Sequence, residues 1–81
     1  MSKISLKSEL SEIIKKEIKQ KKISYSDGIN KTDNWDSISN FNILLKIEKY
    51  FNIKFSTNEF NSLNNFKKIY EIVKNKFKKK N

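Results

Sequence analysis

The 81-residue sequence contains no cysteine, no histidine and no arginine, and it has a single glycine and a single tryptophan. Without cysteine there can be no disulfide framework, no thiolate nucleophile and no cysteine metal site. Without histidine the chain lacks the usual general base and the commonest metal ligand, so a Ser-His-Asp triad within it is impossible. The nine acidic residues form no convincing catalytic pair. These absences predict a protein that is not an enzyme and that binds no metal.

Long apolar runs are also missing. No stretch approaches the ~20 apolar residues that a membrane-spanning helix needs, and residues 1–10 are too polar for a signal peptide. We therefore expect a cytoplasmic protein without a membrane span. The length allows one domain with one modest core, and no repeat or linker divides residues 1–81.

Positive charge is what the chain has in excess. Eighteen lysines stand against nine acidic residues, which gives a formal net charge of +9 at pH 7. A basic domain attracts nucleic acid or an anionic membrane. The absence of arginine weighs against sequence-specific reading of nucleic acid, because arginine makes the bidentate contacts to guanine. Drift in base composition is an alternative explanation, since asparagine and isoleucine are also abundant.

Apolar residues at helical spacing predict four helices, over about residues 5–19, 37–51, 57–63 and 65–77. The stripes expected to form the core are Leu6, Leu10, Ile13, Ile14 and Ile18; Ile43, Leu44, Ile47 and Phe51; Phe60 and Leu63; and Phe66, Ile69, Tyr70, Val73 and Phe77. The predicted fold class is all-α, a small four-helix bundle with three main helices and a short third one.

A long connection, residues 21–35, joins the first two predicted helices. Its expected anchors on the core are Ile23, Tyr25 and Ile29, and Asp27-Gly28 is a turn signal. A connection of this length is unusual in so small a domain and is more often functional. Trp35, at its end, is expected to pack beneath the loop; the alternative is that it is exposed beside Ser37.

Asp36 and Ser37 mark the start of the second predicted helix. Asp36 is a suitable N-cap, and Ser37 is then the first helical residue, an exposed hydroxyl at the positive end of the helix dipole. This position suits a group that will carry a phosphate, because free backbone N–H groups and the dipole favour negative charge. On these residues alone, simple capping of the helix is the alternative.

The second predicted helix has more apolar residues than one face can hold. Ile38, Phe41 and Leu45 recur at i, i+3 and i+7 and form a second stripe that begins beside Ser37. A small domain cannot readily bury both stripes, so we expect this one to face outwards as a docking surface. The alternative is that Phe41 and Leu45 pack inside.

Signals for the following turn are also present. Asn52 tolerates the left-handed conformation that ends a helix, and Ser56 with Glu59 fits a capping box that opens the short third helix.

The run WDSISNFNILLKIEKYFNIKF, residues 35–55, resembles the acyl carrier protein family. Asp36-Ser37-Ile38, an apolar helix, Glu48 and Phe51-Asn52-Ile53 stand where the family has Asp-Ser-Leu, an apolar helix, Glu and Phe-Gly-Ile. A tryptophan before the aspartate also occurs among small free-standing carriers. The resemblance covers most of the chain and implies a bundle of acyl-carrier type. The net charge departs from the family, whose members are usually acidic.

The resemblance also implies a function. A 4′-phosphopantetheine arm would be attached covalently to Ser37 by a phosphopantetheinyl transferase, with Asp36 in a supporting role. Ile38, Phe41, Leu45 and Glu48 would contact partner enzymes, including a loading ligase for acyl or aminoacyl groups and a downstream acyltransferase.

The protein would then be a monomeric thioester carrier, with fatty-acid synthesis, polysaccharide acylation, polyketide or nonribosomal assembly and D-alanine transfer all open. A specialised pathway is preferred over housekeeping fatty-acid synthesis. The alternative, from a different class, is a basic helical module that binds nucleic acid or another acidic partner.

Overall fold

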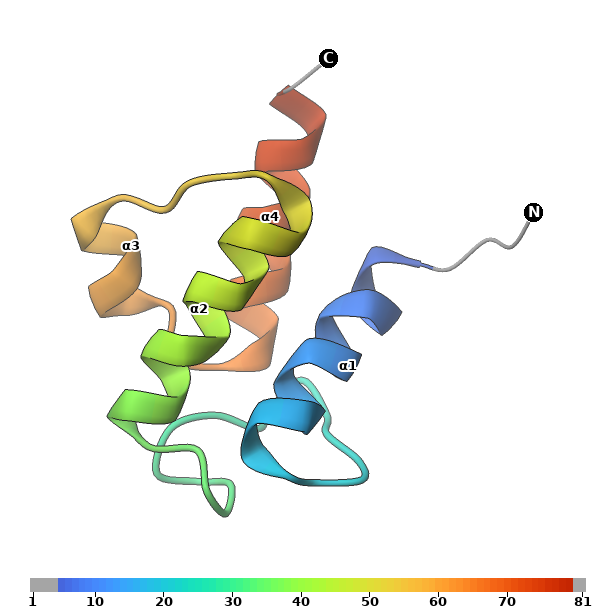
Figure 1. Ribbon diagram of the computed structural model, residues 1–81, viewed down its shortest axis with the longest axis vertical. Coiled ribbons are helices and arrows are strands. Elements are labelled where there is room, and N and C mark those ends of the chain that lie inside the picture. Colours follow the sequence, from blue (N-terminus) through green and yellow to red (C-terminus); the bar gives the residue numbers. More distant parts are fainter. Residues whose placement is uncertain (1–4, 80–81) are drawn as a thin grey trace.

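Four helices form the described part of the chain, which is residues 5–79, with side chains as far as residue 76. In this computed structural model α1 spans Leu6–Ile18, α2 spans Ser37–Phe51, α3 spans Thr57–Ser62 and α4 spans Phe66–Lys79 (Figure 1). No strand occurs among these residues, and the prediction of a small all-α bundle is confirmed. The predicted position of Phe77 in the core lies outside the described side chains.

Each helix begins or ends where the local chemistry predicts. Ser5 caps α1 by accepting a hydrogen bond from the backbone N–H of Ser8, and Lys19 ends that helix in the left-handed conformation. Asn52 ends α2 in the same conformation, with φ 57° and ψ 49°, which confirms the predicted cap. Asn65 lies just outside α4 and accepts a hydrogen bond from the N–H of Lys68, so the last helix begins one residue later than predicted.

The three long helices share one core. α1 packs against both α2 and α4, whereas the short α3 lies on the opposite side of the α2–α4 pair from α1 (Figure 1). The buried apolar residues are Leu10, Ile14, Ile18, Trp35, Ile43, Leu44, Ile47, Phe51, Ile53, Phe55, Leu63, Phe66, Ile69 and Val73. The predicted stripes on α1, α2 and α4 therefore do face the core, and Leu6, Ile13 and Tyr70 pack partly buried against it.

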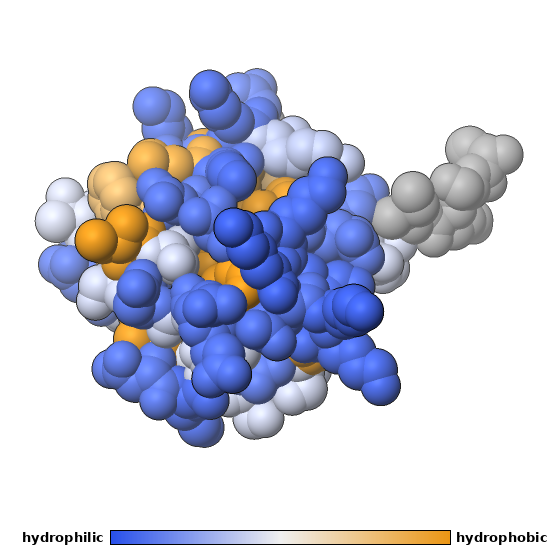
Figure 2. Space-filling model, turned by 60° about the horizontal axis from the view of Figure 1, so that its bottom comes forward, coloured by the Kyte–Doolittle hydropathy of each residue, from blue (hydrophilic) through white to orange (hydrophobic). Residues whose placement is uncertain are grey.

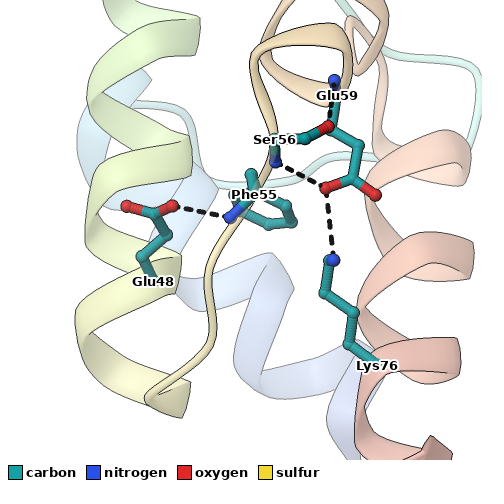
Figure 3. Close-up of polar contacts among 5 residues, drawn as sticks. All are labelled: Glu48, Phe55, Ser56, Glu59 and Lys76. Carbon is teal, nitrogen blue, oxygen red and sulfur yellow. Dashed lines mark hydrogen bonds and ion pairs between the residues drawn. The ribbon is translucent and has the colours of Figure 1, made fainter.

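Two acidic residues tie the α2–α3 region together (Figure 3). The backbone N–H of Phe55 donates to Oε2 of Glu48 at 2.7 Å, and Ser56 and Glu59 form the predicted capping box of α3. Lys76 of α4 lies 3.2 Å from Oε1 of Glu59. Burial raises the pKa of Glu59, but the N–H of Ser56 and the ammonium of Lys76 together outweigh it and lower the pKa below its ordinary value. Because α3 itself buries no residue, these polar contacts help to hold it in place.

The long connection is fixed to the α3–α4 link at Gly28. The backbone N–H of Ile29 donates to the carbonyl of Asn64, and that of Phe66 donates to the carbonyl of Asp27, both at 3.0 Å. One turn ends at Asp27 and another begins at Gly28, as the turn signal predicted, yet Gly28 does not adopt a positive φ. Glycine is needed here for space, because an added Cβ would lie 2.5 Å from the carbonyl oxygen of Asn64.

Gly28→Ala is therefore expected to destabilise the protein by about 1–3 kcal/mol, the usual range for forcing extra atoms into a packed site. The clash falls on backbone atoms, which cannot rotate away as a side chain can. Urea unfolding followed by circular dichroism measures the loss. Asn30→Gly, two residues along the same loop at a positive φ, is the control and should change stability little. Equal stability of Gly28→Ala and the wild type would contradict this close approach.

Candidate functional site

Ser37 is exposed on the first turn of α2. The side chain of Asp36 caps the helix through a 2.8 Å hydrogen bond from the N–H of Ser39 to Oδ1, so Ser37 is the first helical residue, as predicted. The first turn of α2 contains no acidic residue of its own. A phosphate ester on the Ser37 hydroxyl would therefore stand at the positive end of the helix dipole, with Asp36 as the acidic neighbour.

A buried hydrogen-bonded pair supports this exposed turn from below. Trp35 is only 1% exposed, so the prediction that it packs beneath the loop is confirmed. Its indole N–H donates to Oδ1 of Asn40 at 2.9 Å, and Nδ2 of Asn40 donates to the carbonyl of Leu63 at 2.8 Å. One asparagine thus joins the end of the loop, the start of α2 and the end of α3. The residue immediately before Asp36 and Ser37 is consequently held rigid by packing and by a satisfied polar contact.

The loop that leads to Trp35 is held in the same way. Nδ2 of Asn34 donates to the carbonyl of Ile18 at 2.9 Å, at the end of α1. Asn34 has φ 69°, a conformation that asparagine tolerates better than most residues. Of the predicted anchors, Ile23 and Ile29 pack partly buried on the core, while Tyr25 lies on the surface with its ring 5.5 Å from that of Phe66.

An apolar stripe extends from Ser37 along the outside of α2. Ile38 is 73% exposed, Phe41 is 51% exposed and Leu45 is 40% exposed, so the prediction that this stripe faces outwards is confirmed. Figure 2 shows hydrophobic residues reaching the surface mainly on one half of a face that is otherwise hydrophilic. Leaving three large apolar side chains in water is unfavourable for a free domain, and such a patch is typical of a surface that binds a partner.

A cleft of about 520 Å³ opens directly beside Ser37, between α2 and α3. Its lining residues are Ile29, Ser37, Asn40, Phe41, Thr57, Phe60, Asn61 and Asn64. The ring of Phe41 lies 5.2 Å from that of Phe60, which in turn lies 5.9 Å from that of Phe55. The cleft therefore combines aromatic rings with exposed amide side chains, and a flexible chain with both apolar and amide groups would fit it chemically.

The pKa of the Asp36 carboxyl is held below its ordinary value, chiefly because the N–H of Ser39 donates to it. Burial acts in the opposite direction but is outweighed. The carboxylate is thus charged at neutral pH and already engaged by the first turn of α2. It lies next to Ser37 in the chain and orients the turn that presents the hydroxyl.

Asp36→Asn is expected to remove one source of acid sensitivity, because asparagine caps a helix but does not titrate. As the pH falls, Asp36 is protonated in the unfolded chain before it is protonated in the folded protein, because its pKa is lower in the folded state. The stability that its carboxylate contributes is therefore complete above the ordinary pKa of about 3.9. That stability is lost as the pH falls through the lowered pKa of the folded state. Urea unfolding from neutral to strongly acidic pH should show the wild type losing stability relative to Asp36→Asn in that acidic range. Parallel pH profiles for the two proteins would contradict this.

Glu48 has an intramolecular role that the sequence did not indicate. Its carboxylate accepts the backbone N–H of Phe55, and the residue is half-buried. It remains at the edge of the α2 surface, where the resemblance placed a partner contact. Its main visible contribution is to fix the chain that follows α2.

The remaining chemistry of the described residues is limited. Residues 5–79 contain no cluster of three or more acidic, histidine or cysteine side chains suited to a metal ion. Within the same range no helix is both long and apolar enough to cross a membrane.

Sequence reasoning did not identify Asn40, Asn61 or Asn64 as parts of the site. A signal for Asn40 was available, because it stands one turn before Ile43 and Leu44 on the buried face of α2. No comparable signal exists for Asn61 and Asn64, which reach the cleft only through the position of α3.

Comparison of the chain with protein-family models, with curated proteins and with solved structures finds no match in any of the three. The resemblance to acyl carrier proteins therefore stays a prediction.

Proposed function

We propose that the protein is a carrier of the acyl carrier protein type, with 4′-phosphopantetheine attached to Ser37. The observation that carries the proposal is the exposure of the Ser37 hydroxyl at the head of α2, between an exposed apolar stripe and an open cleft. A serine that only helps to start a helix requires neither the apolar stripe nor the cleft. The stripe offers a docking surface for an enzyme, and the cleft offers space for a flexible arm.

The attachment reaction transfers the arm from coenzyme A. The Ser37 oxygen forms a bond to the phosphorus next to the pantetheine, the bond from that phosphorus to the second phosphate breaks, and 3′,5′-ADP leaves. Serine needs a base to accept its proton, and Ser37 forms no hydrogen bond to such a group within residues 5–79. The transferase would supply both this base and its metal ion, while the chain supplies an oriented, accessible oxygen.

The residues around Ser37 fit the arm. Pantetheine contains two amide groups and two methyl groups on one carbon, and the cleft offers the amides of Asn61 and Asn64 beside the rings of Phe41 and Phe60. Once attached, the arm carries a terminal thiol that holds an acyl or aminoacyl group as a thioester. The protein's own contribution is positional: Trp35 and Asn40 hold the attachment turn rigid, and the α2 stripe gives successive enzymes one surface to bind.

The intact mass of the protein tests this proposal. After incubation with coenzyme A, Mg²⁺ and a broad-specificity phosphopantetheinyl transferase, the mass should increase by one phosphopantetheine group. An unchanged mass would reject the carrier function.

The alternative, a basic module that binds nucleic acid, depends on the net charge of +9. It predicts affinity for polyanions that falls steeply with salt. A lack of affinity for single-stranded DNA at physiological salt would reject it.

A further inference from the structure

A second, larger hollow lies at the other end of α2 from Ser37. It has a volume of about 820 Å³ and lies between α2, the end of α1 and the chain just after Asn52. Leu45, the last residue of the apolar stripe, also lines this hollow, together with Ile53. The stripe and the hollow therefore form one continuous surface, which we call the α2 docking face.

Three lysines line the hollow: Lys46, Lys49 and Lys54. The two acidic residues there already have partners within the chain. Glu17 lies 2.7 Å from the ammonium of Lys46 and also accepts a hydrogen bond from Asn42, and Glu48 accepts the backbone N–H of Phe55.

Lys49 and Lys54 are both exposed, and neither forms an ion pair within the described side chains. Three lysines against two glutamates leave the hollow with a net positive charge, and Lys49 and Lys54 are its lysines without an ion pair among the described side chains. At physiological ionic strength this charge acts over about 8 Å, which is enough to attract and orient an acidic surface.

We infer that the α2 docking face binds a partner protein whose own surface is apolar at its centre and acidic at its edge. The inference depends on the proposed function and specifies the partner. Interfaces between proteins place apolar side chains in the centre and charged groups at the rim, where complementary charges speed and orient association. Ile38, Phe41 and Leu45 supply the centre, and Lys49 and Lys54 supply the rim.

This arrangement suits a protein better than a nucleic acid. Contacts to nucleic acid go largely to phosphates, so a nucleic-acid site has its positive groups along the path of the backbone. On α2 the path from Ser37 to Leu45 contains no lysine, and the unpaired lysines begin only at the far end. An acidic protein with an apolar ridge satisfies both parts of the surface at once.

A synthetic peptide tests the inference directly. The probe is an amphipathic helical peptide with leucines on one face and glutamates on either side of them, and the comparison peptide has lysines in place of the glutamates. The glutamate peptide should bind the full chain with salt-sensitive affinity and should shift the backbone NMR signals of Ile38, Phe41 and Leu45. The lysine peptide should not bind.

Matched charge reversals locate the effect. The double variant Lys49→Glu/Lys54→Glu should weaken binding of the glutamate peptide roughly tenfold or more, because attraction becomes repulsion at the rim. Lys67→Glu/Lys68→Glu changes the net charge by the same amount on the first turn of α4, where acidic residues favour the helix, and should weaken binding less than about threefold. Lys49→Gln/Lys54→Gln removes the two positive charges without placing negative charge at the C-terminal end of α2, so it can be used if the charge-reversed variant folds poorly. It should weaken binding of the glutamate peptide by an intermediate amount.

Three results would overturn the inference. The first is that the two charge-reversal variants weaken binding of the glutamate peptide equally. The second is that the peptide shifts NMR signals of residues outside α2 instead of those of the stripe. The third is that oligodeoxythymidine or phosphatidylglycerol vesicles bind to the same residues more tightly than the glutamate peptide does. Loading of Ser37 is read separately by mass. A protein that accepts phosphopantetheine but does not bind the glutamate peptide contradicts only the inference about the partner, whereas one that binds the peptide but cannot be loaded contradicts the proposed function.

Discussion

Replacing Ser37 with alanine is expected to abolish phosphopantetheine loading while leaving the fold intact. We expect no other hydroxyl to substitute, because Ser37 is the first residue of α2 and its side chain is exposed beside the cleft, which Ser39 does not line. Ser37 is exposed and Asp36 provides the cap, so its truncation should change the free energy of unfolding by less than about 0.5 kcal/mol. Intact mass after incubation with coenzyme A and the transferase measures the loss, and circular dichroism checks the fold.

Ser39→Ala is the matched control for this experiment. It removes a hydroxyl two residues further along α2, and it keeps the backbone N–H of Ser39 that donates to the Asp36 carboxylate. This variant should load to completion. Full loading of Ser37→Ala, or failure of both variants to load, would contradict the assignment of Ser37.

Replacing Trp35 with alanine is expected to cost about 3–5 kcal/mol of stability, the range found for large aromatic residues in protein cores. The side chain is almost completely buried, and its removal also leaves the amide oxygen of Asn40 without its donor. Since small domains are stable by only about 5–15 kcal/mol in total, this variant should lose a large fraction of its free energy of unfolding. Urea unfolding followed by circular dichroism measures the effect. Tryptophan fluorescence cannot be used, because this variant has lost the only tryptophan of the sequence.

Two further variants separate the causes. Tyr50→Ala removes an aromatic ring that is 62% exposed, and it should cost much less. Trp35→Phe keeps most of the apolar volume but removes the indole N–H, and it should cost about 1–3 kcal/mol through the unsatisfied Asn40 oxygen. If Trp35→Ala is no more destabilising than Tyr50→Ala, the support proposed for the attachment turn is wrong.

The helices and the exposed stripe could be predicted from the sequence because both depend on local patterns. Asp36, Asn52 and the Ser56–Glu59 pair set the helix ends through hydrogen bonds within a few residues. The outward orientation of Ile38, Phe41 and Leu45 follows from helical periodicity, because the other face of α2 already fills the core.

The parts that could not be predicted depend on contacts between distant segments. The sequence indicated only that Gly28 is a turn residue. The structure shows that residues 64 and 65 approach Gly28 so closely that a side chain there would have no space. Asn40 bridges to Leu63, twenty-three residues away, and no local pattern indicates such a partner. The cleft beside Ser37 likewise exists only because α3 folds back toward the start of α2.

The structure also shows which of the charged side chains have partners within the chain. Several acidic residues are used inside the chain, since Glu17, Glu48 and Glu59 all bond to neighbouring groups, whereas Lys49 and Lys54 do not. At the C-terminal end of α2, Lys46 is paired with Glu17, but Lys49 and Lys54 have no ion pair among the described side chains, so part of the lysine excess stays available at this surface. This is why the partner is inferred to be acidic.

Fragmentation of the loaded protein in a mass spectrometer tests the central claim most directly. After reaction with coenzyme A and the transferase, the peptide that contains residues 35–39 should carry a single phosphopantetheine, and the fragment ions should assign it to Ser37. An unmodified peptide, or a group assigned to Ser39 or to a serine elsewhere in the chain, would contradict the account.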